Sequence, residues 1–179
     1  PRNEHSLALS IAAPHLPANA QTLRLDFPMT RDEREQHAAW QKNARMVAEQ
    51  LADGKNAAFL TLGDPLIYST FGYLMQTLKR EYPEIPVQVV PGITSFQEAA
   101  AKSRTILCEG EENRLIIAGI NPPERLDQAL AASDSAVILK AYKNSEDIYN
   151  ALARAGKSDN AVFAVRLGLA GESLLHGLE

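Results

Sequence analysis

The sequence is poor in the residues that build disulfides and metal sites. Its 179 residues include one cysteine, Cys108, which excludes an internal disulfide and a cysteine metal cluster and fits a reducing, cytoplasmic compartment. The four histidines are scattered and show no metal-ligand spacing: His5, His15, His37 and His176. We therefore expect no dedicated metal site.

The sequence also lacks a positive net charge and any long apolar run. A formal net charge of −4 at pH 7 gives no long-range attraction for nucleic acid or anionic lipid. No apolar run approaches the roughly 20 residues that a helix needs to cross a bilayer, and residues 1–4 do not resemble a signal peptide. With 45% hydrophobic and 22% charged residues, the composition predicts a soluble globular protein without nucleic-acid or membrane partners.

Helical and strand patterns alternate along the chain. Apolar residues at helical spacing predict helices over 4–16, 30–54, 71–82, 94–102, 122–132 and 144–156. Short apolar or alternating runs predict strands over 23–28, 56–62, 85–90, 114–120, 135–142 and 160–166. This alternation predicts an α/β fold with largely parallel sheets and helices on both faces.

Local signals refine these elements. The predicted helix caps are Thr30 with Glu33, Thr94 with Gln97, and Asn144. The run 56–62 is continuously apolar, which predicts a strand buried on both faces. The polar stretch 108–113 precedes a restart of the sheet pattern and is the expected seam between two domains.

Two loops hold the most informative residues, because ligands of doubly wound sheets bind at the carboxyl ends of strands. One is Gly-Asp-Pro at 63–65, and the other is Pro-Gly-Ile-Thr-Ser at 91–95. Glycine permits close backbone approach, proline stiffens a turn, and Asp64 could accept a hydrogen bond from a ligand. A helix opening at Ser69 or Thr70 would also present amides to a carboxylate. The same residues are common in ordinary turns and caps, so taken alone they favour a turn over a site.

Other candidates are weaker. Tyr68, Phe71 and Tyr73 suit either a pocket for a flat ligand or the core. The acidic residues near 109–112 suit a solvated linker, although paired carboxylates can transfer protons. Lys140 follows an apolar strand and could contact substrate carboxylates.

Taken in order, three segments resemble the tetrapyrrole methylases: "FLTLGDPLIYSTFGYLMQTLK", "VQVVPGITSFQEAAAK" and "LCEGEENRLII". The Tyr-Ser-Thr-Phe run at 68–71 and the segment 25–32 are similar to the subgroup that methylates C-20 of precorrin-2. The resemblance extends over about residues 6–178 and is densest over 59–117.

The resemblance implies a homodimer of two α/β/α domains with S-adenosylmethionine bound in the cleft between them. It predicts domains at 1–111 and 112–179. The first would lack the family's opening strand and glycine-rich loop, and the second its closing strands.

The resemblance further implies methyl transfer from S-adenosylmethionine to C-20 of precorrin-2 or cobalt-precorrin-2, in cobalamin biosynthesis. It places cofactor contacts at Leu62, Gly63, Asp64, Ile67, Thr94, Ser95, Leu139 and Gly168. It assigns no general base. Basic groups at the rim of the cleft are expected to meet the carboxylates of the substrate, and the candidates are Arg31, Arg34 and Lys140. The alternatives are another tetrapyrrole methylase, such as a uroporphyrinogen-III C-methyltransferase, or a non-catalytic nucleotide-binding α/β module.

Overall fold

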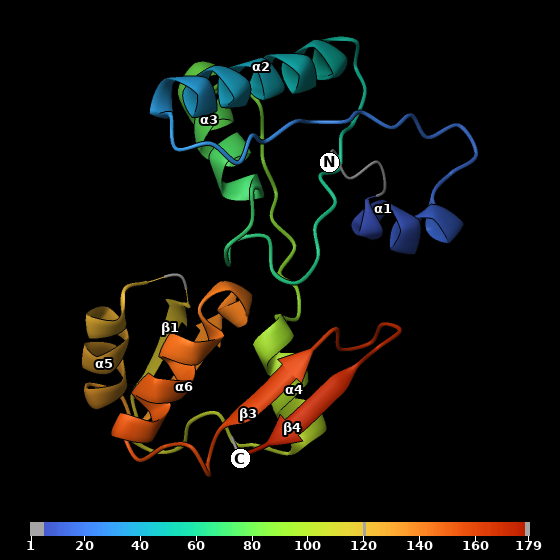
Figure 1. Cartoon of the computed structure of the whole chain (residues 1–179). Coiled ribbons are helices and arrows are strands. Elements are labelled where there is room, and N and C mark those ends of the chain that lie inside the picture. The colour runs from blue at the N-terminus through green and yellow to red at the C-terminus, as the bar shows by residue number, and fades with distance from the viewer. Residues whose placement is uncertain (1–5, 120, 178–179) are drawn as a thin grey trace. The chain divides into compact units, whose positions relative to one another are not determined.

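The computed structural model of the chain describes residues 6–119 and 121–177 and separates into two compact units, Pro1–Thr94 and Ser95–Glu179 (Figure 1). Helices and strands are mixed, which confirms the α/β prediction. Glu4, His5 and Ile120, which the sequence placed in predicted elements, lie outside the described residues. The predicted domain boundary between 111 and 112 remains a prediction.

The first unit is built on helices. Its elements are α1 (Leu7–Ala12), the 3₁₀ turn η1 (Ala13–His15), α2 (Glu33–Ala52) and α3 (Phe71–Glu81). All of them lie where helical periodicity predicted them. Helix α3 ends before Pro83, as expected for a residue that lacks a backbone donor.

The N-terminus of α2 is capped differently from the prediction. The side chain of Asp32 accepts hydrogen bonds from the amides of Arg34 at 2.9 Å and Glu35 at 3.4 Å. Thr30, the predicted cap, instead accepts from the amide of Asp32 at 3.1 Å. The Thr30–Glu33 capping box is therefore wrong by two positions, because the aspartate lies directly before the first helical turn.

Helices α2 and α3 pack together around one small core. Its buried members are Ala44, Val47, Leu74 and Leu78. Side chains of extended segments pack against this core from outside, among them Leu25, Phe27, Phe59 and Ile85. The Phe27 and Phe59 rings meet edge to face at 6.2 Å, so aromatic contacts join two of these segments.

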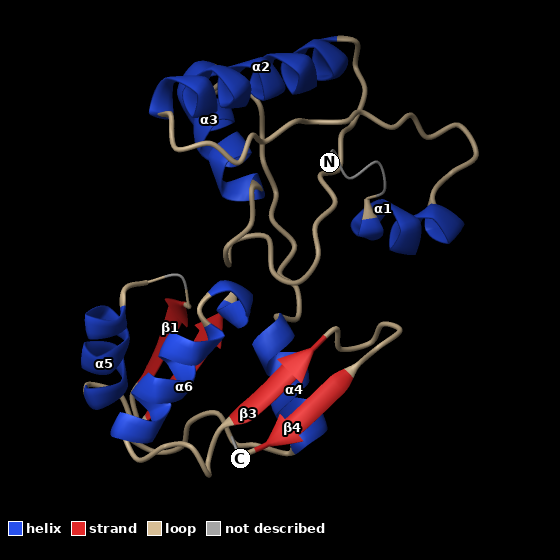
Figure 2. Ribbon diagram, viewed as in Figure 1, coloured by secondary structure: helices blue, strands red, loops and turns tan. Residues whose placement is uncertain are grey.

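The three strands predicted in the first unit, 23–28, 56–62 and 85–90, are not formed. These segments run as loops (Figure 2). Along 56–62 only Phe59 and Thr61 are half-buried, so burial on both faces is also wrong. A strand exists through hydrogen bonds to a neighbour, and no strand ladder is present among the described residues of this unit.

The second unit contains the strands. Its elements are α4 (Ser95–Ser103), β1 (Arg114–Ala118), α5 (Pro123–Ala131), β2 (Ser135–Leu139), η2 (Ala141–Lys143), α6 (Ser145–Arg154), β3 (Val162–Val165) and β4 (Ser173–His176). Strands β1 and β2 are parallel, with Ile116 opposite Val137. The β1–α5–β2 unit is the connection that the alternating pattern predicted.

Helices α5 and α6 pack against each other and against this sheet. The buried core is Ile117, Leu126, Ala129, Leu130, Ile148 and Ala151. Asn144 lies at the N-cap position of α6, as predicted, but its side chain makes no capping hydrogen bond.

Strands β3 and β4 form an antiparallel hairpin, with Phe163 opposite Leu175. The sequence predicted the strand containing β3 and did not predict β4. The hairpin loop, residues 166–172, contains three positive φ angles: 53° at Arg166, 74° at Gly168 and 81° at Gly171. Two glycines in so short a loop are the signal for this hairpin.

Candidate functional site

The loop at 63–65 is shaped by backbone conformation and by a carboxylate. Gly63 has a φ of 70°, a left-handed conformation that other residues rarely adopt. Asp64 Oδ1 accepts from the amide of Leu66 at 2.8 Å. The carbonyl of Asp64 accepts from the amide of Ile67 at 3.3 Å, which closes the turn. The residues favoured in turns thus form a turn here.

Asp64 also joins this loop to the second predicted loop. Its Oδ2 accepts from the amide of Gly92 at 3.1 Å, across 28 positions of sequence. Both carboxylate oxygens therefore bind main-chain amides. The structure gives Asp64 the role of fixing two loops against each other. Its remaining lone pairs are the part of the carboxylate that a ligand could use.

The two loops touch backbone to backbone. A methyl group on Gly92 would overlap the carbonyl oxygen of Gly63 and lie 2.9 Å from its carbonyl carbon. A methyl group on Gly63 would lie 3.6 Å from the carbonyl oxygen of Ile93. Sequence reasoning noted Gly92 as part of the loop and missed this packing requirement. The pair of loops is a cradle lined by main-chain atoms.

The segment after the cradle is held by hydroxyl groups. Ser69 Oγ accepts from the amide of Phe71 at 3.2 Å and lies 3.3 Å from Thr61 Oγ1. Tyr68 has a φ of 50°, which is uncommon for a residue with a side chain. Helix α3 begins at Phe71, where the helical pattern predicted it, directly after the suggested opening at Ser69 or Thr70.

Apolar side chains flank the cradle and remain open to solvent. Leu62 is 52% exposed, Ile67 38%, Tyr68 50% and Ile93 73%. Thr94, by contrast, is only 7% exposed. The cradle therefore combines main-chain polar groups with an apolar rim, which suits a ligand that has both characters.

The remaining predicted contacts lie in the second unit. Ser95 is the first residue of α4, and Leu139 is the last residue of β2. The carbonyl of Leu139 accepts from the amide of Gly119 at 2.6 Å. Lys140, directly after β2, has a φ of 60°. Leu139 and Lys140 therefore lie at the carboxyl end of a parallel strand, where ligands of α/β sheets bind.

Gly168 lies in the β3–β4 loop and is part of an ionic network. Its amide donates to Glu172 Oε2 at 2.6 Å. Lys102 Nζ, on α4, donates to both oxygens of the same carboxylate at 2.7 and 2.6 Å. Lys102 and the Gly168 amide hold the pKa of Glu172 below its usual value. Sequence reasoning missed Glu172 and Lys102.

The predicted contacts therefore form two sets. Leu62, Gly63, Asp64, Ile67 and Thr94 belong to the first unit, and the structure brings their two loops together. The other set, Ser95, Leu139 and Gly168, belongs to the second unit.

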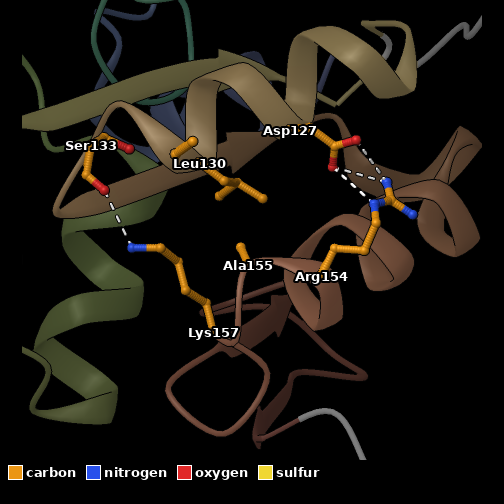
Figure 3. Close-up of a pocket in the computed structure, with 7 residues that line it drawn as sticks. Asp127, Leu130, Ser133, Arg154, Ala155 and Lys157 are labelled. Carbon is orange, nitrogen blue, oxygen red and sulfur yellow. Dashed lines mark hydrogen bonds and ion pairs between the residues drawn. The ribbon is translucent and has the colours of Figure 1, made fainter.

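An open hollow of about 550 Å³ lies between the ends of α5 and α6 (Figure 3). It is lined by Asp127, Leu130, Ala131, Ser133, Arg154, Ala155 and Lys157. Both cations lining it are paired: Arg154 binds the Asp127 carboxylate at 2.9 Å, and Lys157 donates to the carbonyl of Ser133 at 3.2 Å. None of the predicted contacts lines this hollow, and its polar groups serve to fasten the two helices.

Metal ligands do not gather in the part of the chain that the structure describes. No group of three or more potential ligands occurs there. Likewise, no helix in the described ranges is long and apolar enough to span a membrane.

Comparison with known proteins gives consistent matches. Residues 2–179 match a family model described as Tetrapyrrole (Corrin/Porphyrin) Methylases. A cobalt-precorrin-2 C(20)-methyltransferase of Salmonella typhimurium is 34% identical over 167 residues, which cover 93% of this chain and 69% of that protein. A precorrin-2 C(20)-methyltransferase of Sinorhizobium sp is 34% identical over 124 residues, which cover 69% of this chain and 49% of that protein.

A solved structure supports the fold. It is a uroporphyrin-III C-methyl transferase from Thermus thermophilus complexed with S-adenyl homocysteine, with a TM-score of 0.51 at 21% identity. The match covers 82% of this chain and 64% of that one.

Proposed function

Because the chain belongs to the tetrapyrrole methylase family, we propose that it transfers a methyl group from S-adenosylmethionine to C-20 of precorrin-2 or cobalt-precorrin-2 in cobalamin biosynthesis. The product is precorrin-3A or its cobalt form. One observation carries this proposal: the 34% identity over 167 residues with the Salmonella typhimurium protein named for the reaction. The Sinorhizobium relative, named for the metal-free substrate, supports including both forms.

The proposed cofactor contacts are Leu62, Gly63, Asp64, Ile67, Thr94, Ser95, Leu139 and Gly168. The geometry of the loops at 63–65 and 91–94 supports their proposed role in binding the cofactor. The Gly63 and Gly92 backbones approach too closely for a side chain on Gly92, and main-chain atoms line the cradle. The exposed side chains of Leu62 and Ile67 supply an apolar surface beside it. When bound, S-adenosylmethionine supplies an electrophilic methyl group on a sulfonium, which is a good leaving group.

The residues of the chain then act by positioning and by excluding water. The substrate macrocycle is electron-rich and supplies the nucleophilic carbon, so methyl transfer demands alignment more than acid or base catalysis. Asp64 holds the loops at 63–65 and 91–94 in one arrangement. The apolar rim, with Tyr68 exposed on it, is suited to cover a bound macrocycle. No general base is assigned.

The substrate carries many carboxylates, and the proposed cations for them are Arg31, Arg34 and Lys140. All three side chains are exposed. Lys140 is the best supported of them, because it directly follows β2 with a left-handed backbone.

Two broader proposals accompany this function. The protein is a homodimer, in keeping with the family resemblance. It acts in the cytoplasm, in keeping with its single cysteine, Cys108, which is exposed and not part of a disulfide. Sedimentation equilibrium tests the dimer: a monomer mass across micromolar concentrations contradicts it.

We further propose that the family's domain boundary lies between residues 111 and 112, within the second compact unit that the structure describes. The exposed acidic stretch before β1 supports it. Limited proteolysis tests it, because cleavage confined to the region around residue 94 contradicts this boundary.

Calorimetry on the full-length protein tests the cofactor site. Asp64→Ala removes the acceptors of two amides, and we expect S-adenosylhomocysteine affinity to fall about ten-fold or more. The matched control is Asp53→Ala, which removes a carboxylate of the same unit that pairs with Lys55 at 3.4 Å and with no other cation among the described residues. The control should bind within about two-fold of wild type. Equal affinities for wild type and Asp64→Ala would remove the role given to Asp64.

A further inference from the structure

The β3–β4 loop has an unusual backbone with one non-glycine residue in the left-handed region, and it is hydrogen-bonded to a helix outside the loop. Its residues Arg166, Gly168 and Gly171 all have positive φ angles, and Arg166 is not a glycine. Within the loop, the amide of Leu169 donates to the carbonyl of Arg166 at 2.9 Å, and the amide of Glu172 to the carbonyl of Leu169 at 3.1 Å. These turns leave the Gly168 amide to be satisfied elsewhere.

Glu172 satisfies that amide and also fastens the loop to α4. One of its oxygens, Oε2, accepts both from the Gly168 amide at 2.6 Å and from Lys102 Nζ at 2.6 Å. The second oxygen accepts from Lys102 at 2.7 Å. Such charge-assisted bonds are shorter and stronger than neutral ones. The carboxylate therefore links the conformation of the loop to helix α4.

The Glu172 carboxylate connects two segments that each contain a proposed cofactor contact. Gly168 is a proposed cofactor contact, and the space where its side chain would stand is open for about 4 Å. Helix α4 begins with Ser95, another proposed contact in the same unit. A shift of the loop relative to α4 would thus change the distance between two groups that are proposed to bind the same ligand.

We propose that Glu172, braced by Lys102, is a positioning residue that fixes Gly168 relative to α4 for binding of the methyl donor. This inference rests on the proposed function. Glu172 acts through the loop and does not itself touch the ligand. Its lowered pKa and the raised pKa of Lys102 accord with a charged pair near neutrality.

The test uses S-adenosylhomocysteine titrations and methyl-transfer kinetics on the full-length protein. Glu172→Gln keeps the shape and removes the charge; we expect about ten-fold weaker binding and a KM for the methyl donor raised alike. The kcat at a saturating concentration of the methyl donor should stay unchanged, because the bound donor itself holds the loop in its wild-type position. Lys102→Met should weaken binding similarly, whereas Lys102→Arg should restore it.

Two controls make the result specific. Asp127→Asn breaks an ion pair of the same unit, to Arg154 at 2.9 Å, and should bind within about two-fold of wild type. Glu98→Gln removes the other carboxylate near Lys102, at 3.8 Å, without touching the loop, and should also bind as wild type. The Gly168 amide proton, followed by NMR without ligand, should shift in Glu172→Gln and stay in both controls.

The outcomes separate this inference from the proposed function. Wild-type affinity in Glu172→Gln overturns the positioning role while leaving the methyltransferase intact. A fall in kcat with unchanged KM also overturns it. If wild type binds no S-adenosylhomocysteine, the proposed function fails, and this inference fails with it.

Discussion

Gly92→Ala is the substitution that most sharply probes the contact between the two loops. The added methyl group would overlap the carbonyl oxygen of Gly63 and come within 2.9 Å of the carbonyl carbon and 3.5 Å of Asp64 Cα. These are backbone atoms, so no side chain can swing away. The two loops must separate, which also lengthens the hydrogen bond from the Gly92 amide to Asp64.

The expected cost follows from overpacking. Inserting a methyl group where the backbone must move costs about 1–3 kcal/mol. Gly92 has no positive φ, so the cost comes from the clash and not from backbone strain. Gly72→Ala is the matched control, because Gly72 lies in α3 and a methyl group added there would meet no atom within 4 Å. Alanine there should stabilise the protein by about 0.5–1 kcal/mol.

Urea denaturation followed by tryptophan fluorescence measures both effects. Trp40 is the only tryptophan of the chain and lies on α2, stacked on Tyr73 with ring centroids 4.4 Å apart. Its emission therefore reports unfolding of the first unit. With an m-value of about 2 kcal/mol/M, Gly92→Ala should lower the midpoint by about 1 M. A midpoint equal to wild type, with unchanged affinity for S-adenosylhomocysteine, would refute the loop contact.

Three further predictions concern the cap, the ion pair and the core. Asp32→Ala should lower the free energy of unfolding by about 1 kcal/mol in the same urea assay, and Thr30→Ala should lower it by less than about 0.5 kcal/mol. The reverse order would show that Thr30, the cap predicted from sequence, is the true cap. Lys102 lowers the pKa of Glu172 in the folded protein. The Glu172 carboxylate therefore stabilises the folded state fully above pH 4.5, the pKa of a free glutamate, and this stabilisation is lost as the pH falls through the lowered pKa of the folded protein. Thermal unfolding should show the gap between wild type and Glu172→Gln close on acidification, and a gap independent of pH contradicts this. Leu126 is 0% exposed, so Leu126→Ala should lower the free energy of unfolding, followed by circular dichroism, by about 2–5 kcal/mol. A decrease of less than about 1 kcal/mol would contradict the assigned core.

The helices could be predicted because their signals are local. The stripe along α2, with Ala44 and Val47 buried, and the stop of α3 before Pro83 are both properties of short stretches. The cap at Asp32 was missed because Thr30 with Glu33 fits a capping box equally well in sequence. Only the geometry of the first turn distinguishes them.

Strands were harder because each depends on a partner. The runs 114–118 and 135–139 pair with each other, so their prediction is confirmed. The run 56–62 has the same apolar composition but lacks a paired strand in the described structure, and its Phe59 packs inward through aromatic contacts. Composition predicts the ability to form a strand and does not supply its neighbour.

In the candidate site, too, the local features could be predicted from the sequence and the long-range contacts could not. The loops at 63–65 and 91–95 were identified from residue types and from the family resemblance. Their contact through Asp64 joins residues 28 positions apart, which no local pattern specifies. Glu172 was missed because a lone glutamate after two glycines has no distinctive signature; only the positions of Lys102 and Gly168 give it a role.

Location of the transferred methyl group tests the central claim most directly. The full-length protein is incubated with methyl-labelled S-adenosylmethionine and either precorrin-2 or cobalt-precorrin-2, and the product is analysed by mass spectrometry and carbon NMR. We expect one added methyl group, attached at C-20, together with S-adenosylhomocysteine. Methylation at another carbon, methylation of uroporphyrinogen III in its place, or no transfer to either substrate would contradict it.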